Sequence, residues 1–166
     1  MSEAWLNFTI IIIIQSLLFV FYTYYEKKLS DIPHVLRLGI LTGIIFGLLF
    51  DFILGKLFGL HSYALGFGVL FLILNSALSY GLFAATILLM QRARLIKFCV
   101  WTLIVTAVYE ITNHFFHVWT WEFALSQVQF LIVLSVGYFA GAILIATVWH
   151  FFFGYRFLFI DNLLKK

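Results

Sequence analysis

The stretch Thr106–Trp121 reads T-A-V-Y-E-I-T-N-H-F-F-H-V-W-T-W and places one carboxylate and two histidines inside an otherwise apolar segment. On a helix, four of its polar residues fall at positions i, i+3, i+4 and i+7 and share one face: Glu110, Asn113, His114 and His117. Charged residues at the centre of a membrane helix cost about 2.5 to 3.5 kcal/mol on insertion scales and usually face the bundle interior. The stretch therefore predicts a buried functional site.

The composition of the chain determines its class. Of the 166 residues, 64% are hydrophobic and 10% are charged, and apolar runs reach the roughly 20 residues with which a helix crosses a bilayer. A soluble domain needs polar helix faces, so the sequence predicts an all-α, polytopic membrane helix bundle. The formal net charge of +3 is too small to indicate nucleic-acid binding. The single cysteine, Cys99, allows neither an internal disulfide nor a cysteine-based zinc site.

Five membrane spans are predicted within a single domain. The domain covers residues 1–166, with spans at 5–25, 34–58, 63–90, 98–118 and 124–153, followed by an interfacial amphipathic tail. Lysines and arginines gather in the first and third connections and in the tail, whereas the opposite side has only Lys56. Because basic residues favour the cytoplasmic side, this pattern predicts a multi-pass cell-membrane protein with its N-terminus outside and its C-terminus inside.

The second span carries small residues and one carboxylate at every fourth position: Gly39, Gly43, Gly47, Asp51, Gly55 and Gly59. Such a stripe lets another helix approach closely, either within the chain or from a membrane protein partner or a second copy. A packing stripe has no need of a carboxylate, so Asp51 is predicted to belong to the site.

The predicted topology puts the candidate site residues in one layer, because the second and fourth spans run in the same direction. As a catalytic set, we expect Glu110 to act as a general acid, Asp51 to stabilise positive charge and His114 to tune the pair. The candidates for binding a ligand in the same outer half of the membrane are Asn75, Asn113, His117, Trp119, Trp121 and Gln127. A hydrogen bond that only joins helices is an equally good interpretation of Asn75.

The chain also contains a short internal repeat. Asp51 is followed twelve residues later by the aromatic Tyr63, and Glu110 is followed eleven residues later by Trp121. Each unit continues into a long apolar span with a tyrosine next to a glycine, namely Tyr80-Gly81 and Gly137-Tyr138. Repeats of this kind build membrane cavities at a pseudo-symmetry axis.

This acid-to-aromatic repeat resembles the membrane-embedded carotenoid (lycopene) cyclase domains and related small five-span proteins, over residues 41–144. The resemblance implies a helix bundle with an elongated isoprenoid or carotenoid-like ligand. In the cyclases each unit goes on to a Pro-x-Glu-Glu or Pro-x-Glu-Asp motif, whose carboxylates protonate the polyene. The corresponding stretches here read A-L-S-Y-G-L-F at 77–83 and S-V-G-Y-F at 135–139, without those acids.

A second resemblance covers about twenty residues. The run Gly43–Asp51, with Gly59-Leu60 eight residues on, is similar to the central helix of the MreD family of rod-shape-determining membrane proteins. It implies a non-enzymatic scaffold of a wall-elongation complex. Glycine-rich helices also occur in the substrate-binding subunits of vitamin importers, so a small-molecule-binding transporter subunit stays open as well.

A metal site is the last possibility that the spacing raises. Glu110 and His114 stand at i and i+4, with His117 three residues on, and Asp51 would complete the shell. Three candidate ligands on one helix without a firm fourth make an incomplete shell, so we expect a hydrogen-bonded cluster with no metal or other cofactor.

Overall fold

The computed structural model describes residues 3–63, 68–122 and 127–165, apart from the side chains of His61 and residues 127–131. Its α-helices are α1 Glu3–Tyr25, α2 Ile32–Phe50, α3 Val69–Asn75, α4 Gly81–Leu89, α5 Leu95–Phe116, α6 Gln127–Phe153 and α7 Leu158–Leu164. Two wider, π-helical segments extend them: Asp51–Leu57 continues α2, and Ser76–Tyr80 joins α3 to α4. Short 3₁₀ turns lie at Leu29–Asp31 and Met90–Arg92.

Among the described residues, five helices are long and apolar enough to cross a membrane. They are Glu3–Tyr25, Leu29–Leu57, Val69–Arg92, Leu95–Phe116 and Ile132–Phe153. The predicted membrane helix bundle is thus confirmed in its coarse form, a mostly helical fold with five helices of spanning length.

Most predicted boundaries lie within about three residues of those in the structure, and two of the differences have a clear structural cause. The third span begins at Val69 rather than at residue 63, because Tyr63 lies in a strand. The fourth ends at Phe116 rather than at residue 118, because His117 takes the left-handed conformation, with φ of 49°, and ends the helix. The predicted start of the fifth span, residue 124, lies outside the described residues.

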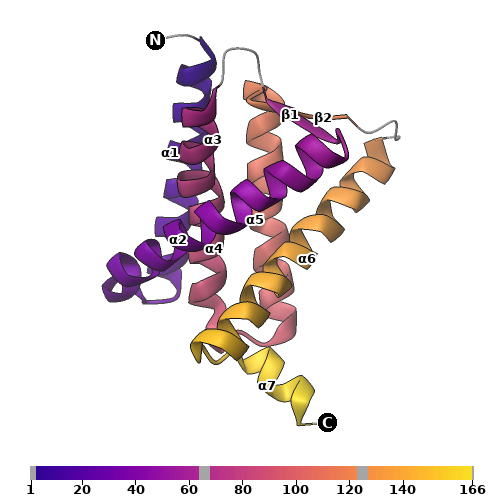
Figure 1. Ribbon diagram of the computed structural model, residues 1–166. Helices are drawn as coiled ribbons and strands as arrows, with labels where there is room; N and C mark the ends of the chain where they lie inside the picture. The colour runs from indigo at the N-terminus through magenta and orange to yellow at the C-terminus, as the bar shows by residue number, and fades with distance from the viewer. Residues whose placement is uncertain (1–2, 64–67, 123–126, 166) are drawn as a thin grey trace.

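A two-stranded ribbon is the element that the all-α prediction missed. Strand β1, His61–Tyr63, pairs antiparallel with β2, Trp119–Trp121, in the register Ser62 opposite Thr120. The hydroxyl oxygens of these two central residues lie 2.7 Å apart. The ribbon joins the chain after α2 to the chain after α5 and lies at the same end of the bundle as the start of α1, with α7 at the other end (Figure 1). We call these the ribbon end and the basic end.

The span formed by α3, the π-helical Ser76–Tyr80 and α4 occupies the centre of the bundle. Every residue from Gly81 to Met90 is buried, whereas α1, α2, α5 and α6 each keep several leucines, isoleucines or phenylalanines exposed. In a bilayer, exposed apolar side chains of this kind face the lipid chains. The four outer helices therefore shield α4 from lipid, whereas α3, at the start of this span, has Val69, Leu70 and Ile73 exposed.

The glycine stripe of α2 packs against this central span. A Cβ added to Gly39, Gly43 or Gly47 would lie less than 3.0 Å from atoms of Gly81 or Ser76. The prediction of close helix packing is therefore confirmed for these three glycines, and the surface that they pack against belongs to the same chain. Gly59 has a different use, because it has φ of +62° in the turn before β1 with nothing within 4 Å.

Polar contacts close the basic end. Lys97 forms an ion pair with Glu26 at 2.7 Å, and Arg156 forms one with Asp161 at 3.4 Å. The ammonium group of Lys28 donates a hydrogen bond to the carbonyl of Leu89 at the end of α4. The connection from α1 to α2, the connection from α4 to α5 and the chain from the end of α6 through α7 lie toward this end (Figure 1). On these segments and the adjoining helix turns stand Lys27, Lys28, Arg37, Arg92, Arg94, Lys97, Arg156 and Lys165.

Candidate functional site

The first half of the site is built around Asp51, at the start of the π-helical segment after α2. The Tyr63 hydroxyl donates a 2.7 Å hydrogen bond to Oδ1 of Asp51, and the Tyr80 hydroxyl donates to the same oxygen at 3.3 Å. The amide nitrogen of Asn75 donates to the Tyr63 oxygen at 2.9 Å. Burial, together with the neighbouring Tyr80 and Asp51, raises the pKa of Tyr63 well above its usual range, so this hydroxyl remains a donor.

The second half is built around Glu110, near the end of α5. The Tyr138 hydroxyl, from α6, donates to Oε1 of Glu110 at 2.6 Å. The indole N–H of Trp121, from β2, donates to Oε2 at 3.3 Å. Both carboxylate oxygens therefore have a donor from another element, as a carboxylate inside an apolar bundle requires.

The sequence repeat corresponds to a structural repeat. In each half a carboxylate near the end of one helix accepts from an aromatic side chain on the ribbon, 12 residues on for Asp51 and 11 for Glu110. It also accepts from a tyrosine on the following helix, 29 and 28 residues on. The antiparallel strands that carry the two ribbon aromatics relate the halves by an approximate twofold axis between Ser62 and Thr120.

The two halves differ in their backbone. Asp51 and Tyr80 belong to π-helical segments and Asn75 immediately precedes one, whereas Glu110 and Tyr138 lie on regular α-helices. Wide turns of this kind inside α-helices are frequent at functional sites. Of the two halves, the first therefore has the backbone conformation that is more typical of a functional site.

A small cavity of about 30 Å³ lies between the halves. Its walls are Tyr63, Asn75, Ser79, Tyr80, Phe83, Tyr109, Trp119, Trp121 and Tyr138. A cavity needs only about 10 to 15 Å³ to hold a water molecule, so the space has room for a small polar group of one or two heavy atoms. Asn75, one of these wall residues, is 3% exposed, and its buried Oδ1 has no hydrogen-bond partner.

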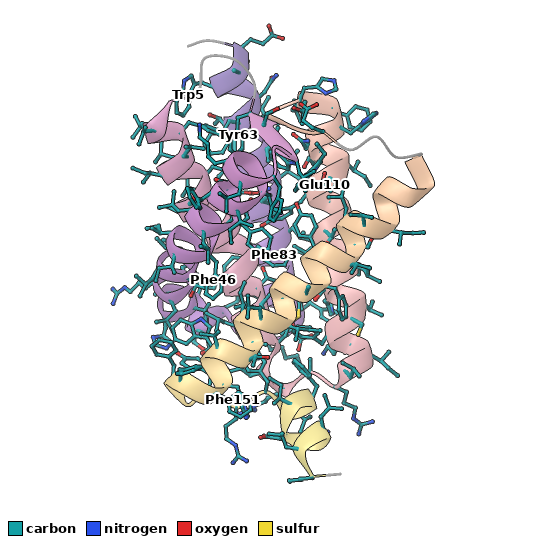
Figure 2. The ribbon with its side chains drawn as sticks, turned by 45° about the vertical axis from the view of Figure 1, so that its right-hand side comes forward. Trp5, Phe46, Tyr63, Phe83, Glu110 and Phe151 are labelled. Carbon is teal, nitrogen blue, oxygen red and sulfur yellow. The ribbon has the colours of Figure 1, made fainter. Side chains whose placement is uncertain are left out.

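A larger cavity of about 350 Å³ lies between α2, α4 and α6. Its walls are mainly apolar: Thr42, Gly43, Phe46, Phe50, Leu54, Leu60, Tyr80, Phe83, Ala84, Trp121, Val133, Leu134, Gly137, Tyr138, Ala140, Gly141 and Ile145. Ligand pockets in proteins commonly measure about 300 to 1,000 Å³ and have apolar walls with few polar groups. Figure 2 shows Tyr63 and Glu110 toward the ribbon end, with Phe83 and then Phe46 farther along the bundle. We call the level of the two carboxylates and their tyrosines the polar layer. Because Phe83 and Phe46 line the larger cavity, this cavity extends from the polar layer toward the middle of the bundle.

The structure brings five of the predicted site residues together. Asp51, Asn75, Glu110, Trp119 and Trp121 all contribute to the two halves or to the walls between them. Neither carboxylate is part of a cavity wall, however. Each lies behind the tyrosine hydroxyl or indole N–H that it orients.

The other predicted site residues lie elsewhere. The side chains of His114 and His117 are exposed, outside the hydrogen-bonded cluster, so the predicted polar face does not extend beyond Asn113. Asn113 lies in the last turn of α5 and binds the backbone that follows the helix. Its Oδ1 accepts from the backbone N–H groups of Val118 and Trp119, each at 3.0 Å, and its Nδ2 donates to the Trp119 carbonyl at 2.8 Å. Gln127 begins α6, but its side chain lies outside the described residues.

The four-ligand metal arrangement suggested by the spacing is not formed. In the part of the chain that the structure describes, no three histidine, cysteine, aspartate or glutamate side chains gather around a common point.

Tyrosines are the site residues that the sequence reasoning did not select. Tyr63, Tyr80 and Tyr138 make the hydrogen bonds to the carboxylates, and Tyr109 lines the small cavity while donating to the Ser79 carbonyl at 3.2 Å. The repeat already contained the signal for the first three, since each stands at a fixed distance after an acid. Tyr109 had no such signal.

No protein-family model, no curated protein and no solved structure matches this chain.

Proposed function

We propose that this chain is a multi-pass membrane protein that binds an elongated, isoprenoid-like lipid in the cavity between α2, α4 and α6. The observation that carries the proposal is the size and lining of that cavity, about 350 Å³ with mainly apolar walls. Burying an apolar chain there gains about 25 cal/mol for each Å² removed from water.

The orientation of the protein follows from its charges. Eight basic residues of the described chain stand at the basic end, whereas the ribbon end has Lys56. The positive-inside rule places the basic end in the cytoplasm. The tyrosine–carboxylate cluster then lies in the outer half of the membrane, and a lipid of the outer leaflet would meet it first.

Binding has better support than acid catalysis by a carboxyl group. Tyr138 and Trp121 line the larger cavity, and Glu110 stands behind them as the acceptor of their hydrogen bonds. A proton from Glu110 would reach a bound polyene only through the Tyr138 hydroxyl. We therefore assign Glu110 and Asp51 as positioning residues, which fix the direction of the groups that touch the ligand.

A scaffold of the MreD kind has less support. It would use the glycine stripe of α2 to hold a partner, whereas Gly39, Gly43 and Gly47 are covered by α4 and the π-helical segment before it. A scaffold would also leave the cavity between α2, α4 and α6 without a use.

The test is to identify the lipid that co-purifies with the protein. The protein is purified in mild detergent, and its bound lipids are extracted and quantified by mass spectrometry against the surrounding membrane. We expect an isoprenoid enriched in the parent protein. Gly137→Phe should lower its amount several-fold, because Gly137 lines the cavity and a Cβ there meets nothing within 4 Å.

Val136→Phe is the matched control, because its side chain is 62% exposed and lies on the outer surface next to Gly137. It should retain the parent amount of lipid. If no isoprenoid is enriched, or if Gly137→Phe retains as much as Val136→Phe, the proposed binding site is wrong.

A further inference from the structure

The two cavities share a wall. Tyr80, Phe83, Trp121 and Tyr138 line both of them. An elongated molecule in the larger, apolar cavity therefore has its end beside the smaller, polar one. The side chains that separate the two spaces are aromatic, and two of them present hydroxyl groups.

The hydrogen bonds of the first half determine which atom of Asn75 is left over. Tyr63 has one hydroxyl proton, which it donates to Asp51 at 2.7 Å. Toward Asn75 its oxygen can only accept, so the amide nitrogen of Asn75 must face it, as it does at 2.9 Å. The amide oxygen of Asn75 is then a buried acceptor without a hydrogen-bond partner, on a residue that lines the small cavity. Buried polar atoms are normally hydrogen-bonded, and this one calls for a donor.

The charges around the cavities restrict the chemistry of that donor. Of the described residues, no lysine or arginine lines either space, while the carboxyl groups of Asp51 and Glu110 stand directly behind the walls. A phosphate or diphosphate would be an anion without a cationic partner there. A phosphate or diphosphate would also exceed a space of about 30 Å³, which holds one or two water-sized groups.

We propose that the ligand is an isoprenoid-like alcohol, whose hydroxyl group enters the small cavity and donates a hydrogen bond to Oδ1 of Asn75 while its chain fills the larger cavity. This inference rests on the proposed function and specifies the class of lipid. The Tyr80 and Tyr138 hydroxyls in the wall that both cavities share already donate their single protons to Asp51 and Glu110, so toward the ligand their oxygens, like that of Asn75, can only accept. Asn75 is then a residue that determines specificity for the head group.

The experiment compares four ligands with the same chain and different heads: farnesol, farnesyl methyl ether, the hydrocarbon farnesene and farnesyl diphosphate. Tritiated forms are partitioned between lipid nanodiscs that contain the protein and empty nanodiscs. We expect farnesol to bind about three- to tenfold more tightly than the methyl ether, which keeps the oxygen and the chain but lacks the donor. Farnesene should bind no better than the ether, and the diphosphate should not bind above the level of empty nanodiscs.

Asn75→Leu keeps the approximate size of the side chain and removes the acceptor. In this variant farnesol and the ether should bind about equally well, while the affinity for farnesene stays within about twofold of the parent. Thr86→Val is the control, because Thr86 is buried on the same central span but binds the Leu82 carbonyl and lines neither cavity. If Asn75→Leu does not fold, the comparison of alcohol and ether on the parent protein decides.

The outcomes separate this inference from the proposed function. Equal binding of alcohol, ether and hydrocarbon, or tightest binding of the diphosphate, would overturn the alcohol specificity and leave the lipid-binding cavity in place. Retention of the preference in Asn75→Leu would remove Asn75 as its cause. Absence of binding for all four ligands would overturn both proposals together.

Discussion

The hydroxyl of Tyr138 lies 2.6 Å from Oε1 of Glu110, which joins the end of α5 to the middle of α6 in the polar layer. This contact and the indole N–H of Trp121 give Glu110 a structural use that does not require its proton. The residue should therefore respond differently to an isosteric change and to an apolar one.

Glu110→Gln should cost about 1 kcal/mol or less in the free energy of unfolding, because the amide oxygen still accepts a hydrogen bond. Glu110→Leu should cost about 2 to 5 kcal/mol, because it leaves the Tyr138 and Trp121 donors buried and unpaired. Denaturant titration of both variants in detergent micelles measures the difference. Equal stability of the two variants would contradict the positioning role.

A second prediction concerns the glycine stripe. Gly43→Ala should destabilise the protein by about 1 to 3 kcal/mol, because the new methyl group would overlap the backbone of Gly81 and Ser76, which cannot give way cheaply. Gly137→Ala is the control, since a Cβ there meets nothing within 4 Å. That variant should be unchanged or up to about 1 kcal/mol more stable, because alanine favours a helix over glycine. The same denaturant titration measures both variants. If Gly137→Ala is destabilised as much as Gly43→Ala, the close contact of Gly43 with the central span is not the cause of the loss.

The third prediction distinguishes two neighbouring residues. Asn113→Leu should cost about 2 to 4 kcal/mol, because it removes the hydrogen bonds that follow the end of α5 and hold Val118 and the first ribbon residue, Trp119. His114→Leu, at the next and exposed position, should change the stability by less than about 0.5 kcal/mol and leave lipid binding as in the parent. A large loss of lipid in His114→Leu would restore His114 to the site.

The fourth prediction concerns the orientation in the membrane. In a Cys99→Ser background, Thr120→Cys at the ribbon end should react with an impermeant thiol reagent added to intact cells. Arg94→Cys at the basic end should react only after the cells are opened, because basic residues stay on the cytoplasmic side. Both positions are exposed, so access through the membrane decides the result. Reversed labelling would move the polar layer to the inner half.

The parts of the fold that depend on local sequence could be predicted, whereas the pairing of segments far apart in the chain could not. The apolar runs predicted the five spanning helices, because the length and hydropathy of a segment are local properties. The ribbon could not be predicted in the same way, since H-S-Y and W-T-W are too short to stand out as strands. Their pairing depends on α2 and α5 ending at the same place.

The same distinction applies to the site. The expectation that Asp51 and Glu110 share a polar layer is met, because both carboxylates lie behind the walls of one small cavity. Helical spacing placed His114 on the face of Glu110 but could not tell how far along the helix that face remains covered. The left-handed turn at His117 then takes the chain away from the helix axis.

The ribbon also links the two halves of the site mechanically. Tyr63 and Trp121 stand on paired strands of three residues each, so any motion that separates the strands withdraws an aromatic donor from both carboxylates at once. A slip of the register by one residue would have the same effect, because it turns each side chain to the opposite face. Opening of the ribbon would therefore remove the hydrogen bond that each carboxylate accepts from it, so the two halves share one structural support.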